Sequence, residues 1–301
     1  MLKNARMRHN FRQAVNSGKI VRMMVAPDAL AAKIAEKMGA KALFSAGYAT
    51  SASALAMPDR GVTDFGISLG RTQEIIAAVN IPVFADVDTG YGDLENVRRT
   101  VENYEAIGAA GLFIEDQIWP KYCGHMDGKQ VEETEVLEEK IRMAVKTRQH
   151  DDFLIMARTD ARAIYGLKDA IKRSQRYRTA GADLIFIEAP QSVRELEIIH
   201  AAFPDTPLMA NMIEDGKTPL TTTDELERLG FNIVAHPTAL TYAQTYAQEE
   251  LLKVLQRDGT THAFKEQMVT FPRFNEFIGL TEVNARDQQY TAEKMKKYLS
   301  D

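Results

Sequence analysis

The 301-residue sequence contains a single cysteine, a single tryptophan and no apolar run long enough to span a membrane. One cysteine excludes a framework of internal disulfides. The polar, basic start of the chain lacks the apolar core of a signal peptide, and a spanning helix would need about 18 or more consecutive apolar residues. These absences predict a soluble protein of a reducing compartment, the cytoplasm.

The sequence also lacks an excess of positive charge. It has 37 Lys and Arg residues against 42 Asp and Glu residues, which gives a formal net charge of −5. Proteins that bind nucleic acid or anionic membranes normally carry a basic patch, so we expect neither partner. With 45% hydrophobic and 26% charged residues, the composition is that of an ordinary globular protein with material for a large core.

Eight short apolar runs recur along the chain at the spacing of βα units. They cover residues 20–28, 42–47, 81–88, 111–117, 153–161, 184–190, 207–212 and 232–237. Their continuous apolar character is typical of parallel strands buried on both faces, and the segments between them have helical patterns, several ending near a glycine. The alternation predicts an α/β fold, a (β/α)8 TIM barrel. A doubly wound sheet is the alternative, because alternation alone does not show closure.

The pattern changes after residue 240, where helical segments replace the alternation. Residues 241–259 predict one helix, and the remaining residues predict more helix, interrupted at Pro272. The many apolar side chains of this tail could pack on the tail's own barrel or on a neighbouring subunit. We therefore predict a single barrel domain over residues 1–301, in which residues 241–301 form a helical C-terminal arm.

The predicted strands end in polar or charged residues, although a buried apolar strand has no packing reason to do so. In chain order these residues are Asp28, Ser45, Asp86 and Asp88, Glu115 and Asp116, Arg158 and Asp160, Glu188, Asn211 and His236. In a barrel the carboxyl ends of the strands converge on one face, where active sites are built. Some acidic residues can be helix N-caps instead, a role that we assign to Asp93, Asp160 and Asp224. That role does not explain Glu115 or Arg158.

Asp86 and Asp88 lie in the segment DVDTGYGD and are expected to project to the same side, because strand side chains alternate. Two hard carboxylates with room for water suit Mg2+. Glu115 follows the next strand, and a barrel would bring it near the pair. A plain strand end followed by a turn is the alternative, since Asp-x-Asp occurs in many unrelated proteins.

The single cysteine, Cys123, lies in WPKYCGHMDGK among cations and glycines, whereas a thiol used for packing normally has apolar neighbours. Lys121 and a protonated His125 would favour the thiolate, and Gly124 and Gly128 would let a loop close over a substrate. Cysteine and histidine together supply only two of the ligands that zinc needs. We therefore prefer an acid–base thiol to a zinc site or an incidental loop cysteine.

Arg158 ends an otherwise apolar run and favours an anionic substrate, because arginine binds carboxylates bidentately. An ion pair with Glu188 or Asp160 is the alternative. The segment SAGYATSASALAMPDRG, residues 45–61, is rich in small residues and could present N–H and hydroxyl groups to an anion. The same residues are compatible with a plain loop at the start of a helix.

Taken in order, seven segments resemble the isocitrate lyase and phosphoenolpyruvate mutase superfamily between about Ser45 and about Asn275. The segments are SAGYATSAS, DVDTGYG, GLFIEDQ, KYCGH, ARTDA, FIEAP and NMIEDGKTPL. The resemblance implies a (β/α)8 barrel whose last helix is swapped between subunits, and a homotetramer. It also implies Mg2+, with Mn2+ as a possible substitute, and a small di- or oxo-acid substrate.

Position by position, the resemblance implies roles for the candidate residues. Asp86 and Asp88 would hold Mg2+, directly or through water, with Glu115 in support. Cys123 would be the catalytic acid or base on a mobile loop, with Gly124 and His125 as further catalytic residues. The substrate would contact Ser45, Ala46, Gly47, Tyr48, Lys121, Arg158, Glu188 and Asn211.

The cysteine loop is similar to that of the carbon–carbon lyases and differs from that of the phosphonate-forming mutases. Lyases commonly carry a second cation where Tyr122 stands, and methylisocitrate lyases carry an arginine near the position of Tyr242. Fewer cations imply fewer substrate carboxylates. The resemblance therefore points to the branch that contains 2,3-dimethylmalate lyase, the petal death protein and methylisocitrate lyase.

We therefore expect a Mg2+-dependent carbon–carbon lyase that cleaves a 2-hydroxy dicarboxylate of the 2-alkylmalate type. The first candidate reaction is the cleavage of 2,3-dimethylmalate to pyruvate and propionate. Alternatives on the same site are 2-methylisocitrate cleavage, oxaloacetate hydrolysis or decarboxylation, and a carboxyphosphonoenolpyruvate rearrangement. A barrel that binds a ligand without catalysis is the remaining alternative.

Overall fold

The computed structural model describes residues 2–290 and 292–299 of the chain. Contacts divide the chain into two compact units, Met1–Ala243 and Gln244–Asp301. The first unit contains all eight described strands, and the described residues of the second form helices and their connections. Of the predicted arm, residues 291, 300 and 301 lie outside the described residues.

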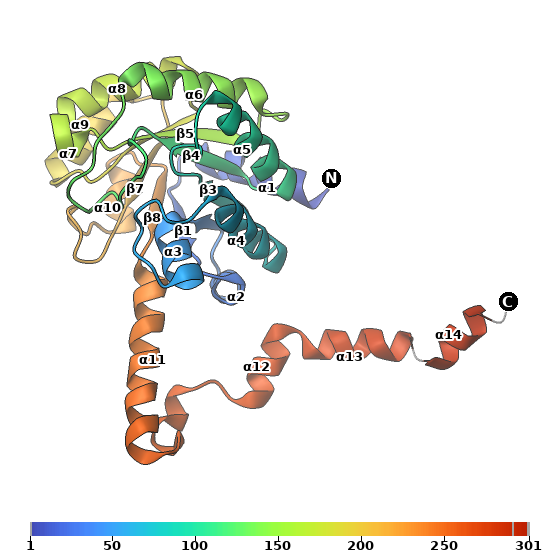
Figure 1. Ribbon diagram of the computed structural model, residues 1–301. Coiled ribbons are helices and arrows are strands. Elements are labelled where there is room, and N and C mark those ends of the chain that lie inside the picture. The colour runs from blue at the N-terminus through green and yellow to red at the C-terminus, as the bar shows by residue number, and fades with distance from the viewer. Residues whose placement is uncertain (1, 291, 300–301) are drawn as a thin grey trace. The chain divides into compact units, whose positions relative to one another are not determined.

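Eight parallel strands close into a barrel in chain order, and the last strand pairs with the first (Figure 1). They are β1 (Val21–Val25), β2 (Ala42–Ser45), β3 (Val83–Asp86), β4 (Gly111–Glu115), β5 (Leu154–Thr159), β6 (Leu184–Ile187), β7 (Leu208–Asn211) and β8 (Ile233–His236). Each lies within a predicted apolar run. Closure confirms the (β/α)8 barrel over the doubly wound sheet, whereas the exchange of a helix between subunits stays a prediction.

Helices surround the strands on the outside of the barrel (Figure 1). They are α1 (Lys3–Val15), α2 (Ala29–Lys37), α3 (Gly47–Leu55), α4 (Phe65–Ala78), α5 (Leu94–Ile107), α6 (Thr134–Thr147), α7 (Arg162–Tyr165), α8 (Leu167–Thr179), α9 (Val193–Ala202) and α10 (Thr223–Arg228). In α5, Val97, Val101 and Tyr104 recur at helical spacing and are buried. Gly108 ends this helix with a φ of 96°, a conformation that glycine adopts readily.

Aromatic side chains fill the inside of the barrel. Phe44 lies against Phe84 and Phe113, and Phe113 lies against Phe186, with ring centroids between 5.8 and 6.2 Å apart. Phe11 of α1 joins the same interior cluster at 5.5 Å from Phe84. Because this packed core leaves no pore, a binding cavity has to form at an end of the barrel.

The C-terminal helices are α11 (Ala239–Asp258), which begins in the barrel unit, the 3-10 helix η1 (His262–Gln267), α12 (Phe271–Ile278), α13 (Leu280–Gln289) and α14 (Ala292–Leu299). The helical tail is interrupted at residues 268–270, close to the predicted position, and Pro272 follows this gap. It lies in the first turn of α12, where its fixed φ suits the helix and its missing N–H is not needed. None of the described helices is both long and apolar enough to cross a membrane.

The acidic residues assigned as N-caps are N-caps only in part. Asp93 precedes α5 but makes no capping hydrogen bond with its side chain. The N-cap of α10 is Thr222, which forms a capping box with Glu225 and leaves Asp224 in the first turn. Asp160 accepts hydrogen bonds from an arginine side chain. The assignments of Asp160 and Asp224 as N-caps were therefore wrong.

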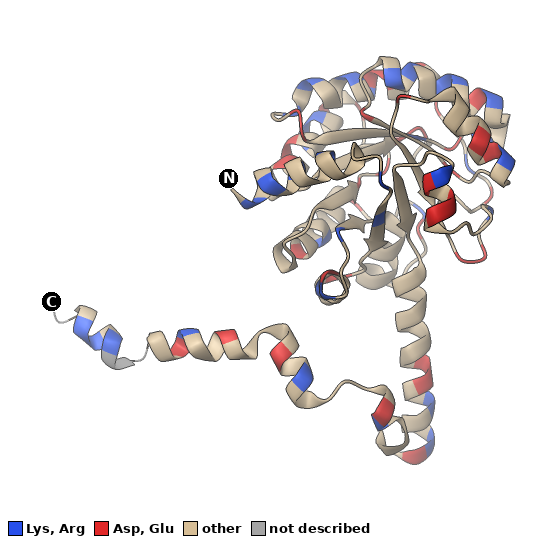
Figure 2. Cartoon of the chain, turned by 180° about the vertical axis from the view of Figure 1, so that it is seen from behind, with Lys and Arg blue, Asp and Glu red and all other residues tan. Residues whose placement is uncertain are grey.

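Charged residues of both signs are interspersed along the outer helices (Figure 2). In α5, for example, Arg98 contacts Glu95 and Glu102 at distances of 2.9 and 2.7 Å. Exposed pairs of this kind contribute about 0.2 to 0.5 kcal/mol each to helix stability. The charges that can carry chemistry are those buried at the carboxyl ends of the strands.

Candidate active site

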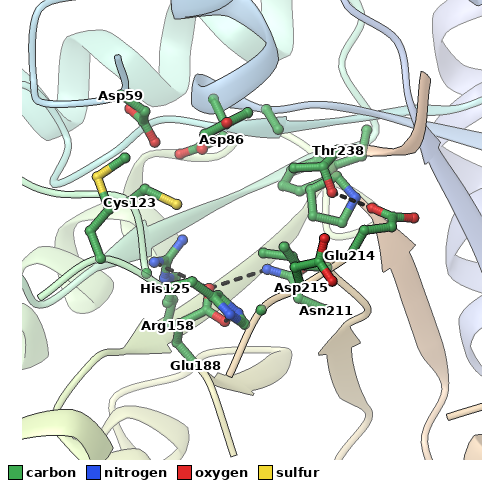
Figure 3. A pocket seen from close by; sticks show the side chains of 18 of the residues that line it. Asp59, Asp86, Cys123, His125, Arg158, Glu188, Asn211, Glu214, Asp215 and Thr238 are labelled. Carbon is green, nitrogen blue, oxygen red and sulfur yellow. Dashed lines mark hydrogen bonds and ion pairs between the residues drawn. The ribbon is translucent and has the colours of Figure 1, made fainter. Parts of the chain in front are cut away.

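A cavity of about 190 Å³ lies at the carboxyl ends of the strands. The predicted residues that line it are Ala46, Tyr48, Asp86, Cys123, Gly124, His125, Arg158, Glu188 and Asn211. Figure 3 shows Asp59 and Asp86 on one side of the cavity, His125, Arg158 and Glu188 on the other, and Cys123 at the edge between them. The barrel thus brings side chains from β3, β5, β6, β7 and the loop after β4 to one place.

The other predicted residues lie close to the cavity without lining it: Ser45, Gly47, Asp88, Glu115 and Lys121. The Ser45 hydroxyl is buried and lies 2.8 Å from that of Thr72. The Gly47 N–H donates to Asp86 Oδ2 at 2.9 Å. A Cβ at Gly47 would lie 3.1 Å from that oxygen and 3.2 Å from Lys121 Nζ, so a larger residue would crowd the charged side chains.

Three buried carboxylates surround one ammonium on this side of the cavity, and we call Asp59, Asp86, Asp88 and Lys121 the acidic group. Lys121 Nζ lies 2.6 Å from Asp59 Oδ1 and 2.8 Å from Asp88 Oδ1. Asp88 lies beyond the end of β3 with a φ of 49°, and its N–H donates to Asp86 Oδ1 at 2.9 Å. A turn therefore holds the two aspartates together, whereas strand alternation was expected to do so.

The acidic group carries more negative charge than Lys121 neutralises. Burial raises the pKa of Asp88 to about 7, with Asp86 and Asp59 adding to the rise and Lys121 opposing it. Burial also raises the pKa of Glu115 well above its ordinary range, an effect that Arg158 offsets only in part. A further cation nearby would lower both pKa values.

The oxygen atoms of this region fit a hard divalent cation. Glu115 Oε1 is buried without a hydrogen-bond partner among the described residues, and Asp59 Oδ1 and Asp88 Oδ1 share the single ammonium of Lys121. Within the same residues, no three His, Cys, Asp or Glu side chains are grouped so as to hold an ion by themselves. Mg2+ is usually bound by one or two carboxylates and keeps several waters, so two carboxylates such as those of Asp86 and Asp88 could hold it.

On the other side of the cavity, two cations contact Asp160 and Glu188, and we call Lys129, Arg158, Asp160 and Glu188 the arginine group. Arg158 Nε lies 2.9 Å from Asp160 Oδ2 and 3.2 Å from Glu115 Oε2, and Arg158 Nη2 lies 3.2 Å from Glu188 Oε2. Lys129 Nζ lies 3.1 Å from Asp160 Oδ1. Both predicted ion pairs of Arg158 are therefore present, while its contact with a substrate stays a prediction.

Glu188 is a carboxylate that stays ionised in spite of its burial. Burial by itself raises its pKa, but the charge of Arg158 and the hydrogen bond from His125 lower the pKa to about 2. Its Oε2 also accepts a hydrogen bond from Asn211 Nδ2 at 3.1 Å. Glu188 therefore stays negatively charged at neutral pH and links β6 to β7 through Asn211.

Cys123 lies half-buried in a loop between β4 and α6, and we call residues 117–131 the cysteine loop. Its N–H donates to the Asp59 carbonyl at 3.0 Å. Burial and the negative charge of Asp59 raise the pKa of Cys123 to about 11. The expectation of a thiolate was therefore wrong, because Lys121 is held by Asp59 and Asp88, and the thiol keeps its proton at neutral pH.

His125 uses both of its ring nitrogens. Nδ1 accepts a hydrogen bond from the Lys217 N–H at 2.8 Å, and Nε2 lies 3.2 Å from Glu188 Oε1. Because a backbone N–H can only donate, Nδ1 carries no proton and Nε2 donates to Glu188. His125 is therefore a neutral imidazole that orients Glu188, with no ring nitrogen left to remove a proton from a substrate.

Sequence reasoning missed several residues of the cavity, among them Asp59, Met126, Ile213, Glu214, Asp215 and Thr238. Asp59 falls within the segment 45–61, but it follows no strand and nothing in its spacing marks it. Tyr242 also lines the cavity, and its hydroxyl lies 3.0 Å from that of Tyr48. This pair joins α3 to α11 and gives the cavity an uncharged wall.

Comparison with known proteins agrees with this geometry. Residues 11–255 match the family described as phosphoenolpyruvate phosphomutase. The chain is 43% identical to 2,3-dimethylmalate lyase of Eubacterium barkeri over 272 residues, which cover 89% of this chain and 94% of that protein. The family match, residues 11–255, therefore includes all eight described strands and the cavity residues named above.

Solved structures of the same superfamily resemble the fold of this chain closely. The structure of oxaloacetate acetylhydrolase in complex with the inhibitor 3,3-difluorooxalacetate superposes with a TM-score of 0.89 at 32% identity, covering 94% of this chain and 96% of that one. Phosphonopyruvate hydrolase in complex with oxalate and Mg2+ superposes with a TM-score of 0.85 at 28% identity, covering 96% and 99%. The chain therefore belongs to the phosphoenolpyruvate mutase and isocitrate lyase superfamily, and it is an enzyme, a carbon–carbon lyase.

Proposed function

We propose that the protein is a Mg2+-dependent lyase that cleaves a 2-hydroxy dicarboxylate of the 2-alkylmalate type, with 2,3-dimethylmalate as the first candidate. The products would be pyruvate and propionate. The observation that carries the proposal is the cavity in which a protonated thiol, Cys123, lies at the edge between Asp86 and Arg158. The 43% identity to 2,3-dimethylmalate lyase supports the choice of substrate.

Asp86 and Asp88 would hold Mg2+, with Glu115 nearby, and Mn2+ could take its place. Bound there, the ion supplies Lewis-acid stabilisation of the oxygen that becomes the keto group. The oxalate and Mg2+ complex of phosphonopyruvate hydrolase supports this assignment. The chain itself supplies negative charge that a divalent cation would neutralise, as the raised pKa of Asp88 indicates.

The substrate carboxylates would lie against the positive end of α3 and against the arginine group. Ser45 ends β2, Ala46 is the N-cap of α3 and Gly47 is its first residue, and at such a helix start the N–H groups and the helix dipole favour an anion. Arg158 and Asn211 line the opposite wall. Because the Tyr48–Tyr242 pair adds no positive charge, the cavity suits two carboxylates better than the three of 2-methylisocitrate.

Cys123 would act as the general acid. Transfer of the hydroxyl proton to a base and cleavage of the C2–C3 bond, whose electron pair stays on C3, leave a keto acid and a carbanion next to the second carboxylate. The thiol proton of Cys123 would pass to that carbon to give propionate, and the raised pKa keeps this proton on sulfur until the carbanion forms. His125 and Glu188 would orient the cysteine loop without transferring the proton.

A panel of substituted malates, 2-methylisocitrate and oxaloacetate, each with Mg2+ and scored for keto-acid release, tests the proposal. We expect turnover of 2-alkylmalates and little turnover of 2-methylisocitrate. Cys123→Ser should lose turnover by a factor of at least about 100, since general acid catalysis contributes about that much, while the variant still binds pyruvate with Mg2+. Near-normal turnover by Cys123→Ser would remove the thiol from the mechanism.

Hydrolysis or decarboxylation of oxaloacetate is the second candidate, because the TM-score to oxaloacetate acetylhydrolase is 0.89. The same panel separates the two, since oxaloacetate yields oxalate and acetate on hydrolysis and pyruvate on decarboxylation. A carboxyphosphonoenolpyruvate rearrangement would release no keto acid from any malate.

We also propose a cytoplasmic homotetramer in which the C-terminal helices, within residues 241–301, are exchanged between subunits. The apolar side chains that these helices expose, such as Phe271, Ile278 and Leu280, support an assembled state. Light scattering of the full chain should give four times the chain mass of 33.7 kDa. A monomer at micromolar concentration would contradict the proposal.

A further inference from the structure

Three lysines fasten the cysteine loop to the barrel. Lys121 belongs to the acidic group. Lys217, from the segment after β7, contacts Asp127 at the tip of the loop, where the Asp127 side chain is 93% exposed. Lys129 lies inside the loop, and its side chain is only 2% exposed. An ammonium buried this completely needs close polar partners, because their interactions have to offset its desolvation.

Lys129 has two partners that tie the loop to the barrel. Its Nζ donates to the carbonyl of Gly124, the residue directly after Cys123. The same Nζ lies 3.1 Å from Asp160 Oδ1, directly after the end of β5. One ammonium therefore bridges the backbone beside the thiol to the barrel. Lys129 does not line the cavity, so it has no position from which to contact a substrate.

At Gly124, the point that Lys129 holds, the loop backbone lies close to Arg158 and Glu188. A Cβ at Gly124 would lie 2.4 Å from Glu188 Cγ and 2.6 Å from Arg158 Nη2. Asp160, the other partner of Lys129, also accepts from Arg158 Nε at 2.9 Å and from Nη2 at 3.2 Å. Asp160 thus binds the Arg158 side chain directly and the loop backbone through Lys129.

We propose that Lys129 is a positioning residue that holds the backbone at Gly124 against Arg158 and Glu188 and thereby fixes the Cys123 thiol at the edge of the cavity. Its effect on turnover rests on the proposed lyase function, whereas its effect on the loop does not. Without the ammonium, the Gly124 carbonyl and Asp160 lose their shared donor and the loop opens more often. The thiol then spends more time in solvent and less time beside the substrate.

The loop contains the chain's one cysteine and one tryptophan, Cys123 and Trp119, so two probes report on it without any substrate. We would measure the rate at which iodoacetamide alkylates the full-length protein, together with the fluorescence of Trp119. A charge-assisted hydrogen bond is worth more than a factor of ten in an opening equilibrium. We therefore expect Lys129→Met to be alkylated at least about tenfold faster than the wild type, with a shifted Trp119 emission.

Two variants serve as matched controls. Lys217→Met removes the exposed pair with Asp127 on the same loop, and such a pair changes an equilibrium by less than about fivefold. Lys129→Arg keeps a cation that can reach both partners and should restore slow alkylation. If Lys129→Met fails to give the circular dichroism spectrum of the wild type, Lys129→Gln replaces it. A rate for Lys129→Gln above that of Lys217→Met supports the proposal, and an equal or lower rate refutes it.

Turnover separates this inference from the proposed function. With an active substrate, Lys129→Met should lower kcat by about tenfold or more and change KM less than twofold, because no cavity residue is altered, and Lys129→Arg should recover most of the loss. If the wild type turns over no dicarboxylate, the proposed function fails while alkylation still decides the role of Lys129. Alkylation of Lys129→Met at the wild-type rate, with unchanged Trp119 emission, would overturn the inference even in an active lyase.

Discussion

The two sides of the cavity bury the same kinds of side chain in opposite electrostatic states. In the acidic group, three carboxylates share one ammonium, and burial raises the pKa of Asp88 to about 7. In the arginine group, two carboxylates face two cations, and these lower the pKa of Glu188 to about 2 in spite of its burial. Burial alone therefore does not determine whether a carboxylate is ionised, because the cations in contact with it also shift its pKa. The acidic group has an excess of negative charge that another cation could neutralise, whereas the four residues of the arginine group have no net charge.

Removing one charge from each side of the cavity tests whether the two groups contribute differently to the free energy of unfolding. Arg158→Met leaves Asp160 and Glu188 buried without their guanidinium, which should lower the free energy of unfolding by about 3–5 kcal/mol. Asp88→Asn removes a negative charge where there is an excess. In the absence of Mg2+, it should leave the free energy of unfolding unchanged or raise it. Urea denaturation at one fixed protein concentration, followed by circular dichroism, measures both.

Arg98→Met is the control for these variants, because its pairs with Glu95 and Glu102 lie on the surface of α5. Its effect on the free energy of unfolding should stay within about 0.5 kcal/mol. Equal losses in Arg158→Met and Asp88→Asn would mean that the two groups are electrostatically alike and would contradict the comparison.

The sequence predicts part of each group and the ion pairs of Arg158, but not the partners of Lys121 or the burial of Lys129. Continuous apolar runs that end in charge are enough to place Asp86, Arg158, Glu188 and Asn211 at one end of a barrel, because parallel strands share a direction. Which cation meets which carboxylate depends on loop paths and side-chain rotamers. No spacing in the sequence indicates that Lys121 reaches Asp59.

The charge state of Cys123 shows the same limit. The cations near Cys123 in the sequence favoured a thiolate. In the fold, however, Lys121 is paired with Asp59 and Asp88, and burial raises the pKa of the thiol. Local sequence gives the residue types near a group, whereas the fold decides which of them are already engaged. The buried position of Lys129 was missed for that reason, since a lysine in a glycine-containing loop is usually solvated.

The pH dependence of stability should sharpen the comparison, because the two groups titrate in opposite directions. The pKa of Asp88 is raised from 3.8 to about 7, so the folded chain binds more protons than the unfolded chain between these values, and the free energy of unfolding falls as pH rises through this window. The pKa of Glu188 is lowered from 4.5 to about 2. Its contribution is fully present above about pH 4.5 and is lost as pH falls toward 2. Between about pH 5 and pH 8, Asp88 therefore titrates while Glu188 stays ionised.

Urea denaturation across this range, with EDTA present, should show a smaller loss of stability in Asp88→Asn than in the wild type, since shared contributions cancel in the difference. Mg2+ at about 100 times its Kd should then stabilise the wild type at pH 8 by about 2.7 kcal/mol. Asp88→Asn should lose most of this gain, and Glu188→Gln should keep it. The same pH profile in Asp88→Asn and wild type, or an equal gain from Mg2+ in both, would show that the acidic group is not the cation site.

The smallest expected effect concerns the place where the cysteine loop meets the arginine group. Gly124→Ala would put a methyl group against Glu188 and Arg158, so the loop has to move and the free energy of unfolding should fall by about 1–3 kcal/mol. Gly70→Ala in α4 is the matched control, because no atom lies within 4 Å of the added Cβ, and alanine should raise helix stability by up to about 1 kcal/mol. Urea denaturation gives both values, and alkylation of Cys123 should speed up in Gly124→Ala alone. Unchanged stability and alkylation in Gly124→Ala would mean that the loop rests on the arginine group loosely, and the balanced charges of that group would then have no role in placing the thiol.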